Sequence, residues 1–207
     1  GKSGAQASDW LSQNVAASFW FTLLSEGLMV LLVIFALRRG RVSFSSVGLG
    51  RPRADFWWRG VLGYGAYLVI VILFLALLNL LIPGFEEGQE QDLLGFDQAG
   101  GAAALLMAFW ALVVFAPLGE EVLMRGYLFS GLRTRLRFMP AAIITSLLFG
   151  FMHLGVLNGE EPLWTAGLAT FLLSAVLVYL REKTGSIWSG VVVHALNNLL
   201  AFGFRFF

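Results

Sequence analysis

Long apolar stretches separated by short polar segments dominate the chain. Six of them, covering residues 17–37, 57–82, 101–118, 138–155, 163–180 and 186–204, are long and apolar enough to be candidate spans. Crossing a hydrocarbon layer of roughly 30 Å takes about 20 helical residues. Unpaired backbone groups cannot face lipid, and the alternating pattern of a membrane barrel is not visible. Each stretch is therefore predicted to be a helix.

The composition agrees with an integral membrane protein. Apolar residues make up 58% of the 207 residues and charged residues only 13%, whereas about a quarter of a soluble domain is charged. The net charge of +1 gives no basis for holding a phosphate backbone, so nucleic acid is not an expected partner. We predict an all-α, polytopic transmembrane helical bundle of about six spans that contacts membrane lipid.

Loop charges predict the orientation of the helices. The loop after the first span is rich in arginine, and the loop after the second is acidic without a base. By the positive-inside rule, the first lies in the cytoplasm, and alternation of the spans then places both termini outside. The acidic loop is interpreted as solvated rather than as a cation site. These residues are Arg38, Arg39, Arg41, Arg51, Arg53 and Arg59 in the first loop, and Glu86, Glu87, Glu90, Asp92 and Asp97 in the second.

A few ionisable residues interrupt the apolar pattern in the second half of the chain. Both histidines of the protein, His153 and His194, lie in spans, and Glu120, Glu121 and Arg125 follow the third span. An ionisable side chain at mid-membrane costs roughly 2.5–3.5 kcal/mol, so such residues normally face a cavity and mark function. We expect these residues to converge on one polar site.

Helical spacing gives the first of these residues different roles. Glu121 and Arg125 are four residues apart and can form an ion pair on one helix face. Glu120 is rotated by about 100° and stays available as a general base. Phe149 precedes His153 by four residues, so its ring can brace the imidazole.

The last span adds hydrogen-bond donors. His194 shares a helix face with Asn198 at four residues and with Asn197 at three, and spacing does not choose between them. Imidazole and carboxamide N–H groups can hold an oxyanion in a water-poor cavity. Together with an acid and a histidine that activate water, this set suits amide hydrolysis.

Other classes of membrane protease are not favoured by the residues present. His153 is followed by Leu154, so no HExxH zinc motif exists. An aspartyl dyad is excluded because every aspartate lies outside the spans. Ser130 and Ser189 each precede a glycine, but neither has the preceding glycine of a serine nucleophile turn.

The polar residues form three motifs in order: EExxxR at 120–125, FxxxH at 149–153 and HxxxN at 194–198. This ordered set resembles the CAAX protease and bacteriocin-processing (CPBP, or Abi) family of intramembrane proteases. The resemblance covers roughly residues 101–205. It implies a CAAX-protease-like core in the last four spans, and it prefers Asn198 over Asn197.

The resemblance also implies a mechanism. Glu120 with His153 would activate water, and His194 with Asn198 would line the oxyanion side. The supporting residues would be Glu121, Arg125 and Phe149. No metal is expected to be required, although His153, His194 and Glu120 are the ligands that a zinc ion would use.

We accordingly expect an intramembrane endopeptidase that cleaves membrane-associated or lipidated peptides in a bacterial plasma membrane. Its predicted organisation is an N-terminal extramembrane segment (1–16), two accessory helices with their loops (17–100) and the catalytic core (101–207). Two alternatives stay open. One is a non-catalytic family member that acts as a bacteriocin-immunity factor or partner-binding scaffold, and the other is a transporter or proton pathway.

Depth along the membrane raises a geometric difficulty. With straight upright helices, Glu120 lies about 27 Å from the outer face, whereas His153 lies about 20 Å from the inner face. Bringing them within about 8 Å then requires span three to be bent or to start deeper in the membrane, and Pro117 and Gly119 are the natural break. We expect residues 118–136 to run obliquely below a cavity formed by the last four spans, open to the cytoplasmic side.

Overall fold

The computed structural model describes residues 10–82, 85, 93, 95–156 and 161–207, and every regular element in that part of the chain is helical. This confirms the predicted all-α bundle. The helices are α2 (Val15–Arg39), α3 (Phe56–Leu81), η1 (Phe96–Gln98), α4 (Ala102–Phe109), η2 (Trp110–Phe115), α5 (Ala116–Glu121), η3 (Val122–Phe129), α6 (Ser130–Arg133), α7 (Phe138–Met152), α8 (Trp164–Thr184) and α9 (Trp188–Phe206).

Within the described residues, four helical stretches are long and apolar enough to cross a membrane. These are Val15–Arg39, Phe56–Leu81, Ala102–Arg133 and Trp164–Thr184. Helix α7 is apolar but only 15 residues long. The six predicted spans therefore correspond to six long helical stretches, of which four meet the requirement for spanning a membrane on their own.

Residues 102–133 form one continuous helix made of α4, η2, α5, η3 and α6, which we call the long helix. The predicted break at Pro117 and Gly119 is therefore wrong. Pro117 has no N–H to donate to the preceding turn, and that turn is wound as a π-helix (Trp110–Phe115). The wider turn absorbs the missing hydrogen bond without ending the helix. At 1.5 Å per residue, 32 residues extend over about 48 Å.

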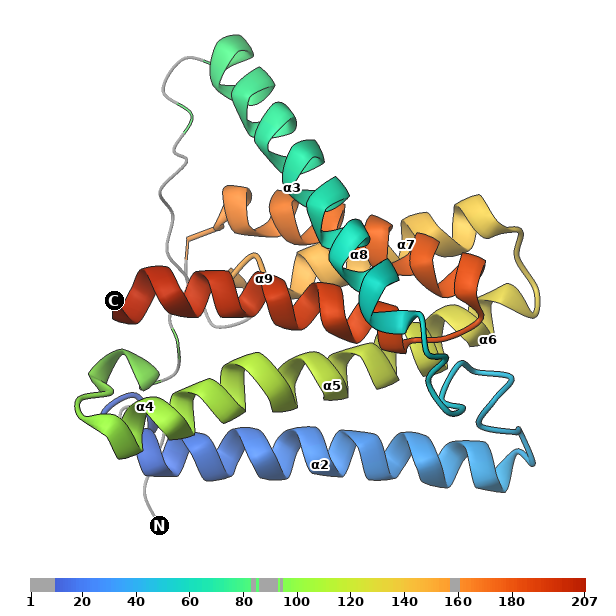
Figure 1. Ribbon diagram of the computed structural model, residues 1–207, viewed down its shortest axis with the longest axis horizontal. Helices are drawn as coiled ribbons and strands as arrows, with labels where there is room; N and C mark the ends of the chain where they lie inside the picture. Colours follow the sequence, from blue (N-terminus) through green and yellow to red (C-terminus); the bar gives the residue numbers. More distant parts are fainter. Residues whose placement is uncertain (1–9, 83–84, 86–92, 94, 157–160) are drawn as a thin grey trace.

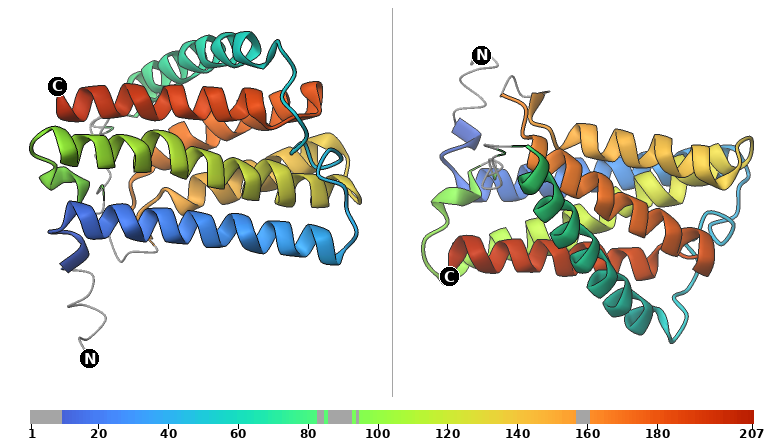
Figure 2. Two further views of the ribbon diagram at one scale, coloured as in Figure 1. Left: turned by 60° about the horizontal axis from the view of Figure 1, so that its bottom comes forward. Right: turned by 90° about the horizontal axis from the view of Figure 1, so that it is seen from above.

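The long helix lies at the centre of the arrangement. Helix α2 runs beside it and contacts α4, α5 and η3, while α9 packs against its η2 and α5 segments (Figure 1). Helices α7 and α8 pack against each other. Helix α3 crosses α8 and α9 (Figure 2), and its distal half projects away from the bundle (Figure 1).

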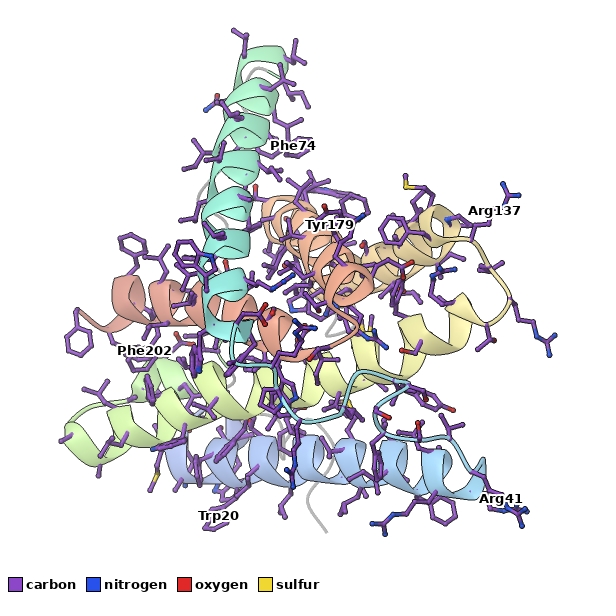
Figure 3. All side chains as sticks on the ribbon, turned by 45° about the vertical axis from the view of Figure 1, so that its right-hand side comes forward. Trp20, Arg41, Phe74, Arg137, Tyr179 and Phe202 are labelled. Carbon is purple, nitrogen blue, oxygen red and sulfur yellow. The ribbon has the colours of Figure 1, made fainter. Side chains whose placement is uncertain are left out.

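One end of the bundle carries the arginine-rich loops, as Arg41 and Arg137 show in Figure 3, and we call it the arginine-rich end. The segment after α2 folds back across this end. There Gly48 accepts a hydrogen bond from the Ile187 N–H at 3.1 Å, and Gly50 accepts one from the Trp188 indole at 2.7 Å. An apolar cluster of buried residues packs at this end, and its members are Val33, Leu37, Val47, Val122 and Ile187.

The opposite end holds the C-terminus and η1. Phe96 and Phe202 belong to an apolar cluster there with residues of the long helix. Asp97 accepts a hydrogen bond from Arg205 Nε at 2.8 Å, which ties η1 to the end of α9. Asp97 is therefore paired rather than simply solvated. The other acidic positions of this loop, Glu86, Glu87, Glu90 and Asp92, lie outside the described residues.

Candidate active site

A cavity of about 780 Å³ lies inside the bundle and contains the predicted polar residues. Glu120, His153 and His194 all line it, so residues from three separate helices meet at one place as predicted. Helices α2, α3 and α8 complete the wall. Their lining residues are Phe21, Thr22, Ser25 and Glu26 of α2, Tyr67 of α3, and Ala166, Ala169, Thr170 and Leu173 of α8.

The predicted ion pair forms behind this cavity. Arg125 Nη1 donates to Glu121 Oε1 at 2.8 Å, and both side chains are 0% exposed. Their i,i+4 spacing makes the contact possible on one helix face. Gly190 of α9 lies against the same carboxylate, since a Cβ there would sit 2.8 Å from Glu121 Oε2. The pair is therefore held from both sides by closely packed backbone and side chains.

His194 lies between the two neighbouring carboxylates. Its Nδ1 is 3.3 Å from Glu121 Oε1, and its Nε2 is 3.7 Å from Glu120 Oε2. A carboxylate can only accept a hydrogen bond, so in the contact between His194 and Glu121 the imidazole Nδ1 carries the proton. Nε2 is left facing Glu120 at the cavity.

Phe149 is the common packing partner of the site residues. Its fully buried ring lies 4.7 Å from the His153 ring and 5.7 Å from the His194 ring, measured between centroids. The Arg125 guanidinium stands 4.4 Å from the centroid of the same ring, in cation–π geometry. The predicted brace for His153 is confirmed, and the same ring also supports His194 and Arg125.

His153 caps the C-terminal end of α7. Its Nδ1 donates to the Phe149 carbonyl at 2.8 Å, because a carbonyl oxygen can only accept. In the neutral imidazole, Nε2 then carries the lone pair. The ring thus has an orienting hydrogen bond on one nitrogen and a basic nitrogen on the other.

Glu120 differs from its neighbour Glu121 in its surroundings. Its side chain is 26% exposed and lines the cavity. The Oε2 atom is buried and accepts no hydrogen bond from the part of the chain that the structure describes. One helical position therefore separates a carboxylate committed to a buried ion pair from one that faces the cavity, as the spacing predicted.

The two asparagines also line the cavity. Asn198 Nδ2 donates to the Leu112 carbonyl at 2.9 Å, which lies in the π-helical turn η2. Asn197 Nδ2 lies 3.4 Å from Asn198 Oδ1. Asn198 is thus fixed by the long helix on one side and by Asn197 on the other. Its amide has a second N–H beyond the one given to Leu112.

Comparison with known proteins adds a family assignment. Residues 102–200 match the family model described as type II CAAX prenyl endopeptidase Rce1-like. Through this segment, the chain is similar to the CAAX protease family. No curated protein and no solved structure matches the chain. The match supports a CAAX-type membrane endopeptidase at family level.

The CAAX protease segment contains every site residue that the sequence motifs indicated, but it does not form the whole cavity. Helices α2 and α3 lie outside residues 102–200 and still contribute to the wall. The expectation that the last four spans alone form the cavity is therefore wrong. The reason is packing, since α2 runs along the long helix and α3 crosses α8 and α9.

Glu26 is the site residue that sequence reasoning missed. It lies in the middle of α2 and lines the cavity together with Glu120. A carboxylic acid in the middle of an otherwise apolar span was the signal that could have found it. No motif surrounds Glu26, and the other acidic residues and both histidines of the candidate site lie in the second half of the chain.

The cavity includes residues at the C-terminal end of the bundle. Leu93, Phe96 and Arg205 line it, and all three lie at that end. Under the charge rule this end is the outer one. The expected opening to the cytoplasmic side stays a prediction.

The site residues include potential metal ligands. The described His, Asp and Glu side chains include no group of three arranged to hold a metal ion. Each histidine has an orienting contact at Nδ1, and such a contact does not compete with metal binding through Nε2. Independence from metal and the alternative of a zinc ion on His153, His194 and Glu120 both stay predictions.

Proposed function

We propose that the protein is an intramembrane endopeptidase that hydrolyses peptide bonds of membrane-associated or lipidated peptides. Glu120 and His153 activate the attacking water, and His194 and Asn198 receive the oxyanion. The observation that carries the proposal is the cavity-facing Glu120 carboxylate, whose buried Oε2 has no hydrogen-bond partner among the described residues and lies 3.7 Å from His194 Nε2. A group with open acceptor capacity beside a second titratable group is suited to move a proton.

The proposed reaction moves one proton through Glu120. The carboxylate removes a proton from water while the water oxygen attacks the substrate carbonyl carbon. His153 Nε2 accepts a hydrogen bond from the other water hydrogen and orients it. Glu120 then gives its proton to the departing nitrogen as the C–N bond breaks. The products are an amine and a carboxylic acid, which releases the remaining proton on ionising.

Charge balance supports the oxyanion role of His194. Nδ1 faces Glu121, so an N–H at Nε2 requires the doubly protonated imidazolium. Glu120 and Glu121 contribute two negative charges, and Arg125 with a protonated His194 contribute two positive charges. The cluster is then neutral in its buried surroundings. Nε2–H and the second amide N–H of Asn198 become the two oxyanion donors.

A single substitution tests the proposal. Glu120→Gln keeps the size of the side chain but removes the base, so cleavage of a quenched lipopeptide in liposomes should fall by about 10²–10⁴-fold. The matched control is Glu182→Gln, which changes an exposed ion pair with Arg133 at 2.9 Å and should leave turnover unchanged. His153→Ala should lose activity like Glu120→Gln while keeping its helical circular dichroism.

The outcomes separate the proposal from its alternatives. Unchanged turnover in purified Glu120→Gln would remove the mechanism. Binding of the lipopeptide by the wild-type protein without any cleavage would instead favour the non-catalytic binding role. Ion or proton flux through liposomes that depends on Glu120, without cleavage, would favour the transporter.

A further inference from the structure

Glu26 is a carboxylic acid placed in the membrane-spanning helix that the family match does not include. It lies at the twelfth position of the 25-residue helix α2. Its neighbours on that helix are mostly apolar and face outward, as Trp20 does in Figure 3. An ionisable group at this depth is unfavourable unless it faces a cavity. Glu26 does so, because it lines the same cavity as Glu120, His153 and His194.

The Glu26 carboxyl group has no compensating partner. Its Oε2 is buried, and Glu26 makes no hydrogen bond or ion pair with any residue that the structure describes. Structural carboxylates in this protein look different, since Glu121 is paired with Arg125 and Glu182 with Arg133. A structural role as an ion-pair partner therefore does not account for Glu26.

The backbone is shaped to admit this carboxyl group beside the proposed base. Oε2 of Glu26 lies directly over Gly119, and a Cβ on Gly119 would overlap it. Gly119 immediately precedes Glu120 in α5. The absent side chain at Gly119 thus creates the space in which the carboxyl group of α2 approaches Glu120.

Two neighbouring carboxyl groups in a water-poor cavity do not both ionise readily. Glu26 Oε2 lies against Gly119, the residue before Glu120, and both carboxyl groups line the same cavity. Like charges at such a site favour a state in which the pair holds one proton. Glu120 has His194 Nε2 at 3.7 Å, which favours its charged form, whereas Glu26 forms no ion pair with any residue that the structure describes. The proton is therefore assigned to Glu26.

We propose that Glu26 is a second carboxyl group of the active site, which holds a proton and donates a hydrogen bond to Glu120 during turnover. This inference rests on the proposed peptidase function. Glu26 acts through Glu120 and is a positioning residue. It keeps the carboxylate aligned with the water, and it prevents a second negative charge from opposing the developing oxyanion.

The first test observes the proton directly. Infrared spectra of the purified wild-type protein at neutral pH should contain the C=O stretching band of a protonated carboxyl group, and Glu26→Gln should lack that component. Histidine and arginine do not contribute this band. Absence of the difference band would overturn the proposal, as would a band that persists in Glu26→Gln and disappears only in Glu120→Gln.

The second test uses rescue by a conservative variant. The amide of Glu26→Gln can donate to Glu120 as a carboxylic acid does, so its kcat/KM should stay close to that of the wild type. Glu26→Leu has no donor and should be about 10²-fold lower, the loss typical of a misplaced catalytic group. Leu24→Ala, on the exposed face of the same helix, is the control for disturbance of α2 and should keep full activity.

Gly119→Ala tests the geometry with Glu26 still present. The added methyl group would displace the Glu26 carboxyl group and should reproduce the lower kcat/KM of Glu26→Leu. Equal activity of the Gln and Leu variants at position 26 would overturn the positioning role. Failure of the proposed peptidase function gives a different result, because Glu120→Gln would then stay active.

Discussion

Removal of Arg125 should destabilise the protein strongly. Its guanidinium and the Glu121 carboxylate are both 0% exposed and 2.8 Å apart, so solvent cannot replace either partner. Arg125→Ala leaves the Glu121 charge buried without its cation. Breaking a buried pair in this way costs about 3–5 kcal/mol. The lost cation–π contact with Phe149 at 4.4 Å adds to this cost.

The magnitude can be measured as a thermal shift in detergent. For a chain of this size, 1 kcal/mol corresponds to about 2–4 °C, so Arg125→Ala should lower Tm by about 6–20 °C. Arg133→Ala is a matched control on the same long helix, because its pair with Glu182 is 32% exposed on both sides. Pairs of that kind contribute about 0–1 kcal/mol.

A double substitution separates charge from packing. Glu121→Leu combined with Arg125→Met replaces the pair by apolar side chains of similar size, and it should recover most of the stability lost in Arg125→Ala. It should not recover activity, because His194 loses the carboxylate at 3.3 Å that orients its Nδ1. If Arg125→Ala shifted Tm no more than Arg133→Ala, the reasoning about the buried pair would be refuted.

Two further substitutions test the support of the site. Gly190→Ala places a methyl group 2.8 Å from Glu121 Oε2 and should lower both Tm and kcat. This loss is expected even though alanine is more favourable than glycine inside a helix by about 1 kcal/mol. An unchanged kcat would show that the Glu121 position tolerates the shift. Asn198→Ala removes a proposed oxyanion donor and should lower kcat by about 10²–10³-fold with little change in KM, and an equal effect of Asn197→Ala would contradict the choice between the two asparagines.

Local periodicity was sufficient for part of the site. The pairing of Glu121 with Arg125 and the contact of Phe149 with His153 follow from i,i+4 spacing within single helices, and both are present. The separate environment of Glu120 also follows from its rotation about the helix axis. These features depend on helix geometry, which the sequence determines locally.

Contacts between helices were less predictable. Helices α2 and α3 are apolar on nearly all sides, because lipid and protein neighbours both accept apolar side chains. The pattern therefore does not mark which face turns inward, and Glu26 was not connected with Glu120. The break at Pro117 was predicted wrongly for a related reason, because the hydrophobic pattern does not indicate the π-helical turn η2 that precedes it.

The amino-acid sequence alone determined that the chain forms apolar helices, which polar residues share a helix face, and which family the motifs resemble. Only the tertiary structure decided that α2 belongs to the cavity wall, that His194 lies between two carboxylates, and that an apolar cluster joins α2, the long helix and Ile187 at the arginine-rich end. Apolar side chains are favourable on every face of a helix in a lipid bilayer. The helix that packs against each face is therefore determined by the shapes of specific side chains and by glycines that allow close approach.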